Sequence, residues 1–231
     1  MLSACCVAQP CCWTGSTNAA TMQSPKEWKL CFVGDPGVGK TSIGIRYKHN
    51  QFHEKQTSTV GAAFFSVDVT VDGELHRLNT WDTAGQERYR SLAPLYYRNT
   101  QAVVMVYSVS KYDTYQNVTG AWLQSIRAHT DDDVLIIIVG NKLDTAQEHR
   151  EVETEEAQRF AADIEAEFFE TSAKTGDNID ELFTNIARRL KALNNTRQAR
   201  RNYSITSTSS TRSTNSLSET PEHRHSAGCC R

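Results

Sequence analysis

The most specific pattern in this chain is Gly34-Asp35-Pro36-Gly37-Val38-Gly39-Lys40-Thr41. It fits G-x-x-x-x-G-K-[ST], in which glycines let backbone N–H groups curl around phosphate oxygens. An apolar run, residues 29–33, precedes the pattern and a helical pattern, residues 40–48, follows it. This context predicts a phosphate-binding loop, with the Lys40 ammonium reaching the β- and γ-phosphates and the Thr41 hydroxyl on Mg²⁺.

A second motif, Asp82-Thr83-Ala84-Gly85-Gln86, follows a predicted strand. Asp82 is suited to hold Mg²⁺ through water, the Gly85 N–H to meet the γ-phosphate, and Gln86 to orient an attacking water. Thr59, in a short polar loop, is the best candidate for a second hydroxyl on the metal. The sequence therefore predicts Mg²⁺ ligands at Thr41, Thr59 and Asp82, and catalytic roles for Lys40, Thr59 and Gln86.

A third motif, Asn141-Lys142-Leu143-Asp144, indicates which base is bound. A carboxylate at Asp144 accepts two hydrogen bonds from guanine N1–H and N2–H₂. Adenine lacks these donors, so leaving the carboxylate unpaired would cost about 1–3 kcal/mol of binding free energy. Lys142 can lay its stem along the base, and Ser172-Ala173-Lys174 can give a backbone N–H to guanine O6. The three motifs in this order predict a guanine-nucleotide switch. Its predicted nucleotide-binding residues are Gly34, Asp35, Gly37, Val38, Gly39, Lys40, Thr41, Ser42, Phe52, Thr59, Gly85, Asn141, Lys142, Asp144, Ser172, Ala173 and Lys174.

Strand and helix patterns alternate along the middle of the chain. Two uninterrupted apolar runs, residues 102–107 and 134–139, predict strands buried on both faces of a parallel sheet. Asp72-Gly73 predicts a hairpin turn between two further strands. The pattern predicts an α/β fold, a six-stranded and mostly parallel sheet with helices on both faces and the ligand at the carboxyl ends of its strands. Helices are expected at residues 118–129, 154–163 and 179–193, and the last strand at 168–171.

The 231 residues divide by composition into a globular domain, 28–193, a leader, 1–27, and a tail, 194–231, with both ends expected to be disordered. The net charge of −2 hides an asymmetry, because residues 191–231 carry seven basic residues against two glutamates, a net charge of +5. A basic tail on an acidic body suggests attraction to an anionic surface. Incidental arginines in a solvated tail explain the charge equally well.

Six of the seven cysteines lie in adjacent pairs near the two ends, and only Cys31 falls in the predicted domain. This is no disulfide framework, so a reducing compartment is expected. A secretory signal and a membrane-spanning run are also not expected. For Cys5, Cys6, Cys11 and Cys12, S-acylation, weak metal binding and no role all remain open, and Met22 is an alternative start.

These motifs resemble the Ras superfamily of small GTPases, with its P-loop fold, and within it the Rab family. The resemblance covers about residues 28–193 and is carried by the run from Trp81 to Leu92. Gly61-Ala62-Ala63-Phe64-Phe65 and the run from Leu92 to Arg98 are most similar to the early-endosomal Rab subgroup. Pro36 departs from the pattern because it has no N–H for a phosphate, and Ser108 stands where many Rabs have Asp.

The resemblance implies a GTP-driven switch in which residues 52–65 and 83–98 respond to the γ-phosphate. It also implies that Phe52 packs on the guanine edge and that effectors read Phe64, Trp81 and Tyr96. Expected partners are guanine nucleotide, an exchange factor, a GTPase-activating protein, an escort protein, a dissociation inhibitor and effectors, with a monomeric protein and no nucleic acid. The chain ends Gly228-Cys229-Cys230-Arg231, like Rabs whose two cysteines, here Cys229 and Cys230, receive geranylgeranyl groups. The implied location is the cytoplasmic face of endosomal membranes, or the plasma membrane, in exchange with the cytosol.

Other readings remain open. The protein could serve another compartment, Golgi or late endocytic, or be a scaffold that binds GTP without hydrolysing it. A P-loop metabolite kinase would need an acceptor site and an arginine-bearing lid, and the chain has no insertion to build them.

Overall fold

The computed structural model describes residues 24–209, with side chains up to residue 199. A six-stranded sheet runs through it in the order β2-β3-β1-β4-β5-β6. Neighbouring strands are parallel, except that β2 runs antiparallel to β3. This confirms the predicted α/β fold. The strands are β1 (Lys26–Val33), β2 (Ala62–Val71), β3 (Glu74–Thr83), β4 (Ala102–Ser108), β5 (Leu135–Asn141) and β6 (Glu167–Thr171).

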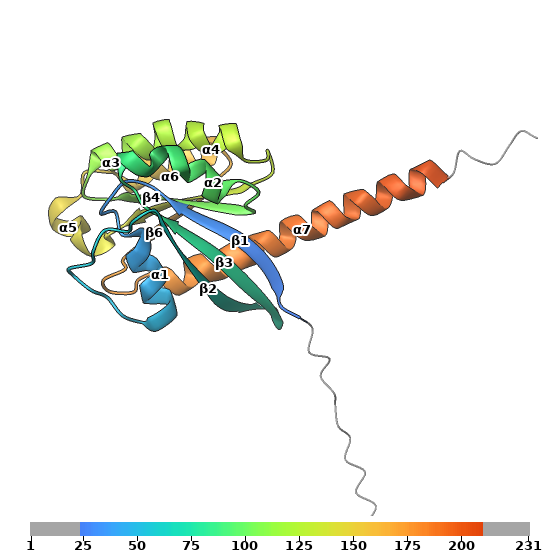
Figure 1. The fold of residues 1–231 in the computed structure, drawn as a ribbon, viewed down its shortest axis with the longest axis horizontal. Coiled ribbons are helices and arrows are strands. Elements are labelled where there is room, and N and C mark those ends of the chain that lie inside the picture. The colour runs from blue at the N-terminus through green and yellow to red at the C-terminus, as the bar shows by residue number, and fades with distance from the viewer. Residues whose placement is uncertain (1–23, 210–231) are drawn as a thin grey trace, which may run out of the picture.

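Helices cover both faces of the sheet (Figure 1). Side chains alternate along the central strands, so that Phe32 and Val104 pack into one core and Cys31 and Val103 into the other. Helices α1 and α7 close the first core, and α2, α4 and α6 close the second. The helices are α1 (Lys40–His49), α2 (Ala93–Tyr97), α3 (Tyr112–Asn117), α4 (Leu123–His129), α5 (Ala146–His149), α6 (Thr154–Asp163) and α7 (Ile179–Ser209), with 3₁₀ helices η1 (Glu87–Leu92) and η3 (Leu143–Thr145) and a π-helical turn η2 (Val118–Trp122).

The predicted hairpin joins β2 to β3. Asp72 and Gly73 both have positive φ, 51° and 77°, which is the backbone of a tight two-residue turn. The predicted helix over residues 118–129 is longer than expected, because α3, η2 and α4 follow one another without a break from Tyr112 to His129.

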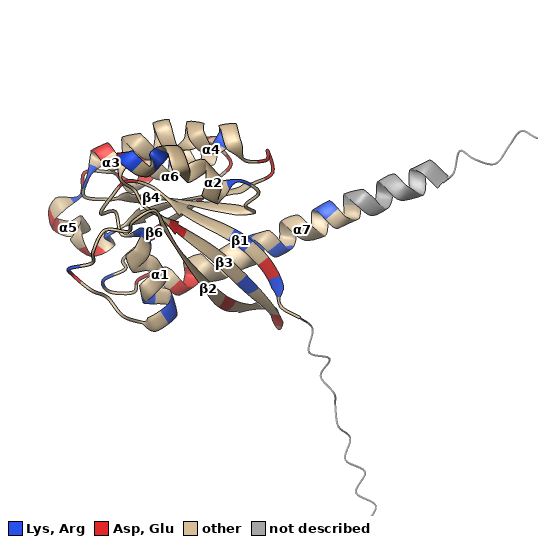
Figure 2. Cartoon of the chain, in the orientation of Figure 1, with Lys and Arg blue, Asp and Glu red and all other residues tan. Residues whose placement is uncertain are grey.

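Helix α7 extends beyond its predicted end at residue 193 and projects from the body to Ser209 (Figure 1). Its continuation has a simple cause, since residues 194–209 contain no glycine or proline to stop a helix. Figure 2 shows basic positions in blue along the described part of α7. Two of the basic residues of this helix form ion pairs with the body: Lys191 Nζ lies 3.2 Å from Asp72 Oδ2, and Arg197 Nη2 lies 2.5 Å from Asp133 Oδ2. The boundary predicted at residue 194 therefore falls inside a helix.

The predicted lipid-carrying residues Cys229 and Cys230 lie outside the described residues, as do Cys5, Cys6, Cys11, Cys12 and Met22. None of the helices in the described part is both long and apolar enough to cross a bilayer.

Candidate nucleotide-binding site

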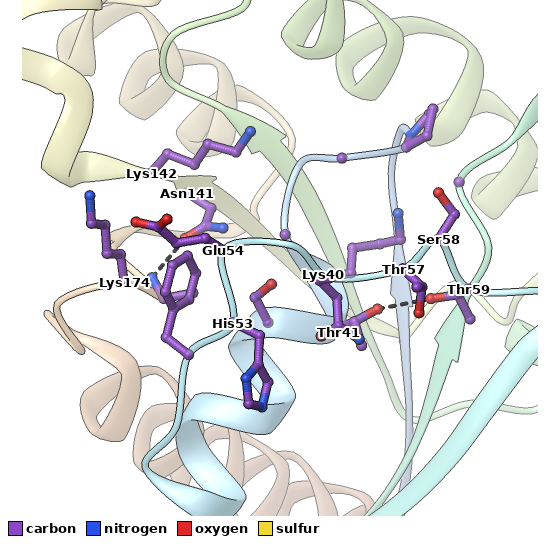
Figure 3. Close-up of a pocket in the computed structure, with 18 of the residues that line it drawn as sticks. Lys40, Thr41, His53, Glu54, Thr57, Ser58, Thr59, Asn141, Lys142 and Lys174 are labelled. Atoms are coloured by element: carbon purple, nitrogen blue, oxygen red, sulfur yellow. Dashed lines mark hydrogen bonds between the residues drawn. The ribbon is translucent and has the colours of Figure 1, made fainter.

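A cavity of about 310 Å³ lies where the predicted motifs meet, after the carboxyl ends of β1, β3, β5 and β6. Figure 3 shows Lys40, Thr41 and Thr59 toward one end of it and Asn141, Lys142 and Lys174 toward the other. Most of the predicted binding residues line it, namely Gly37, Gly39, Lys40, Thr41, Ser42, Phe52, Thr59, Gly85, Asn141, Lys142, Asp144, Ala173 and Lys174, together with Gln86. Its two ends have different chemistry.

The loop before α1 surrounds the side chain of Lys40. The ammonium donates to the carbonyl oxygens of Gly34 at 2.8 Å and Asp35 at 2.9 Å, and the residue is 6% exposed. Burial lowers the pKa of Lys40 to about 8, against the opposing effect of nearby carboxylates. Gly39, with φ of 101°, leads directly into α1, so the positive end of the helix dipole also points at this loop. The loop is thus suited to an anion.

Three oxygen-bearing side chains meet beside Lys40. Thr41 Oγ1 donates to Asp82 Oδ2 at 2.5 Å and lies 2.9 Å from Thr59 Oγ1, and Thr59 Oγ1 lies 3.4 Å from the same carboxylate oxygen. The other oxygen, Asp82 Oδ1, is buried with no hydrogen-bond partner among the described residues. Burial raises the pKa of this carboxyl, while Thr41 and Lys40 oppose the shift. Hard oxygen donors and an unpartnered carboxylate oxygen fit a cation such as Mg²⁺.

Asp35 is placed differently from the prediction that it binds nucleotide. Its carboxylate does not line the cavity and accepts hydrogen bonds from Trp122 Nε1 at 3.0 Å and Asn117 Nδ2 at 2.6 Å. Gly34, Val38 and Ser172 also lie outside the lining. The Gly34 carbonyl accepts a hydrogen bond from Lys40, and the Val38 carbonyl accepts one from Asn141. Ser172 supports the opposite end of the cavity by donating to Asp144.

Gln86 lines the cavity, but its side-chain oxygen accepts a hydrogen bond from Arg88 Nε at 2.7 Å. To orient a water as predicted, the side-chain amide of Gln86 would have to give up this bond. Gly85, just before it, packs so closely on Gly34, Asp35 and Pro36 that a Cβ would overlap their main-chain atoms. The two motifs can approach one another because this residue is glycine.

Asn141 joins the two ends of the cavity. Its Nδ2 donates to the Val38 carbonyl at 2.8 Å, and its Oδ1 accepts from Thr171 Oγ1 at 3.3 Å and from the Ala173 N–H at 3.2 Å. The buried side chain thereby holds the loop before α1 against the loop after β6, and it still lines the cavity.

Asp144 and Lys142 form the far wall. Ser172 Oγ donates to Asp144 Oδ1 at 2.6 Å, which orients the carboxylate. Lys142 adopts a left-handed backbone, φ 71°, at the start of η3, and burial lowers its pKa. The wall thus offers an oriented acceptor beside an aliphatic stem, as a purine edge requires.

The cavity also has a wall that the motifs do not identify. His53, Glu54, Gln56, Thr57 and Ser58 line it between the predicted residues Phe52 and Thr59. In the sequence, only their position between two predicted binding residues points to them, because a polar loop has no hydrophobic periodicity.

A separate aromatic surface lies on β2, β3 and α2. Trp81 lies between Phe64 and Tyr96, with ring centroids 5.2 Å and 5.5 Å away. Phe64 is 56% exposed and Leu95, beside Tyr96, is 70% exposed. The structure thus brings the three predicted effector-reading side chains together on an accessible surface.

Comparison with known proteins agrees with this geometry. The model of the Ras family matches residues 29–192. The chain is 42% identical over 188 residues to GTP-binding protein ypt5 of Schizosaccharomyces pombe, covering 81% of this chain and 87% of that one. It is 42% identical over 165 residues to Ras-related protein Rab-22A of Homo sapiens, covering 71% and 84%. It is 41% identical over 172 residues to Ras-related protein Rab-31 of Rattus norvegicus, covering 74% and 87%.

Proposed function

The chain belongs to the Ras family and, within it, to the Rab GTPases, and from this premise we propose that it is a Mg²⁺-dependent, lipid-anchored switch of endosomal membranes. As a Rab GTPase it binds GTP and GDP, hydrolyses GTP and acts in vesicle trafficking with regulators and effectors. The observation that carries the finer proposal is the meeting of Thr41, Thr59 and Asp82 beside the Lys40 ammonium.

In the proposed mechanism, Lys40 binds the β- and γ-phosphate oxygens. Thr41, Thr59 and Asp82 would hold Mg²⁺, which would supply positive charge against the negative charge of the phosphates. Gln86 exchanges its bond with Arg88 for a water and orients that water toward the γ-phosphorus. Hydrolysis alone is slow, and an activating protein that supplies an arginine accelerates it by about 10³–10⁵-fold.

At the base end, Asp144 accepts hydrogen bonds from the guanine N1–H and N2–H₂ while Ser172 holds its carboxylate in place. Lys142 and Phe52 pack on the base, and the loop after β6 donates an N–H to O6. Adenine offers neither the two donors nor the carbonyl, so the polar groups of this wall would lose their partners. This supports selective binding of guanine nucleotides.

The switch needs a membrane anchor, and the adjacent Cys229 and Cys230 supply two sites for geranylgeranyl groups. One lipid chain gives only marginal and reversible binding, so two are required for stable attachment. An escort protein would present the chain for modification, a dissociation inhibitor would remove it from membranes, and an exchange factor would release GDP. We assign the protein to the cytoplasmic face of endosomes.

The test is to localise N-terminally tagged full-length protein during uptake of a fluid-phase tracer, beside the Cys229→Ser/Cys230→Ser variant. Wild type should mark compartments that the tracer reaches within minutes, and the variant should be diffuse. Wild type on Golgi or late compartments would contradict the endosomal assignment. A variant that stays on membranes would contradict the lipid anchor and move attention to the N-terminal cysteines.

A further inference from the structure

Arg46 lies on α1, outside the cavity, and reaches the loop that forms the base end. Its Nε donates to the Ala173 carbonyl at 2.8 Å and its Nη2 to the Lys174 carbonyl at 2.5 Å. Ala173 and Lys174 line the cavity and Arg46 does not. The loop therefore lies between the guanidinium and the space where a base would sit.

The two held carbonyls determine where an amide of this loop points. The described residues contain no cis peptide bonds, and in a planar trans peptide the N–H points opposite to the C=O. Because Arg46 holds the Ala173 carbonyl on its own side, the Lys174 N–H of the same peptide points to the opposite side, toward the cavity. The Ala173 N–H already donates to Asn141 Oδ1. The Lys174 N–H is thus the donor that this arrangement presents to a base carbonyl.

The third nitrogen of Arg46 is also fixed. Nη1 donates to the main-chain and side-chain oxygens of Asn50, both at 3.1 Å. Asn50 ends α1 in a left-handed conformation, φ 51°, two residues before Phe52. A planar guanidinium can make all of these bonds at once, whereas a lysine ammonium at the same place cannot reproduce the fork.

We propose that Arg46 is a positioning residue for guanine recognition: by holding the carbonyls of Ala173 and Lys174 it aims the Lys174 N–H at guanine O6. Arg46 itself does not touch the nucleotide. The inference rests on the proposed binding of guanine O6 by this loop, and it identifies Arg46 as the residue that holds the loop in the required position.

The test measures nucleotide release from the full-length protein with three diphosphates. GDP and inosine diphosphate carry O6, and 2-aminopurine riboside diphosphate, which is itself fluorescent, lacks it. Arg46→Lys and Arg46→Gln are compared with wild type and with Arg159→Lys, an exposed arginine of α6 whose side chain donates a hydrogen bond only to the Glu155 carbonyl among the described residues. We expect GDP and inosine diphosphate to leave the Arg46 variants about tenfold faster, as the loss of one good hydrogen bond implies.

The analogue without O6 should leave wild type and the Arg46 variants at the same rate, and Arg159→Lys should match wild type throughout. Equal acceleration of all three nucleotides would overturn the inference, because Arg46 would then support the fold in general. Unchanged release of GDP would overturn it too. If wild type itself releases GDP as fast as the analogue, the proposed reading of O6 fails first, and this outcome is visible without any variant.

Discussion

The indole Nε1 of Trp122 donates a hydrogen bond to Asp35 Oδ1 across 3.0 Å, and so joins the phosphate-binding loop to the π-helical turn η2. Asn117 Nδ2 holds the other oxygen at 2.6 Å. The guanidinium of Arg90, on η1, lies 5.1 Å from the Trp122 ring and 3.7 Å from Asp35 Oδ1. The acidic residue of the loop is therefore used to attach it to the neighbouring helices.

Replacing Trp122 with phenylalanine should destabilise the fold. Trp122→Phe leaves a nearly buried carboxylate oxygen without its indole donor, so we expect a loss of about 1–3 kcal/mol in the free energy of unfolding. Urea denaturation of the GDP-bound protein measures it. A cycle with Asp35→Ala provides the control, because alanine removes the acceptor. If Trp122→Phe costs as much in that background, the hydrogen bond is not the cause and the loss comes from packing.

Exchanging Asp144 for asparagine should change which base is preferred. An amide at this position offers a donor, and xanthine carries a carbonyl where guanine has its amino group. Asp144→Asn should therefore lose affinity for GDP by about tenfold or more and gain affinity for xanthosine diphosphate. Equilibrium titration with both nucleotides measures the change. Ser172→Ala removes the donor to the carboxylate and the acceptor of the Thr175 N–H but leaves the carboxylate itself, so it should weaken GDP binding without any gain for xanthosine diphosphate.

Removal of Mg²⁺ should accelerate nucleotide release through the cluster around Asp82. If Thr41, Thr59 and Asp82 hold Mg²⁺ as proposed, EDTA should speed GDP release from wild type, because the cation would no longer link these side chains to the phosphates. Thr41→Val keeps the shape but removes one oxygen donor, and should lower the affinity for Mg²⁺ by at least about tenfold. The variant should release GDP quickly even before EDTA is added. An EDTA response as large as that of wild type would place the metal elsewhere.

Lowering the pH should reduce the free energy of unfolding through His76, a buried residue of β3. Trp28 Nε1 donates to His76 Nδ1 at 3.1 Å, so the buried ring is neutral, with its proton on Nε2. Burial lowers the pKa of His76 in the folded protein. The charged groups that face it are Lys26 and Lys191, which lower the pKa further, and Glu74 and Asp72, which raise it.

The free energy of unfolding falls as the pH falls, because the unfolded chain binds a proton at His76 before the folded chain does. The unfolded chain takes up this proton below about pH 6.5, whereas the folded chain takes it up only at a lower pH. Between these two pH values the loss is at most about 1.4 kcal/mol per pH unit. His76→Gln keeps an acceptor for Trp28 but does not titrate. Urea denaturation followed by tryptophan fluorescence should show a smaller loss between pH 7 and 5.5 in the variant. Parallel curves for the two proteins would contradict the assignment.

Adjacent phenylalanines on β2 should respond differently to truncation. Phe65 packs on the core beneath α1, whereas Phe64 is 56% exposed beside Trp81. Phe65→Ala should cost about 2 kcal/mol or more in the free energy of unfolding, and Phe64→Ala less than about 1 kcal/mol. Thermal or urea unfolding of the pair measures both. Equal losses would show that Phe64 is held in the fold rather than left for partners.

Much of this fold can be predicted from the sequence because the patterns that form it are local. The uninterrupted apolar runs of β4 and β5 predict central strands, and Asp72-Gly73 predicts the turn between β2 and β3. Helices η1 and α2 were harder to predict because they are short, and α2 has only Ala93 and Tyr97 buried. Their form depends on packing against the sheet.

The parts of the site that escaped prediction depend on contacts between distant residues. The direction of the Asp35 carboxylate is determined by Trp122, 87 positions later, and the geometry of the loop at Ala173 by Arg46, 127 positions earlier. A motif specifies which residue types surround a ligand, because that chemistry is local. It does not specify which side chains turn away to support the others, as Asp35 does.

The length of α7 has a geometric consequence. From Arg197, where it pairs with Asp133, to Ser209 the helix adds twelve residues, about 18 Å. A helix transmits angle as well as distance, since each residue turns it by about 100°. Deleting a single residue here would shorten the arm very little but would rotate the rest of the helix, up to Ser209, by more than a quarter of a turn relative to the GTPase domain. The helical phase of the arm therefore determines the side of the domain toward which its end at Ser209 faces.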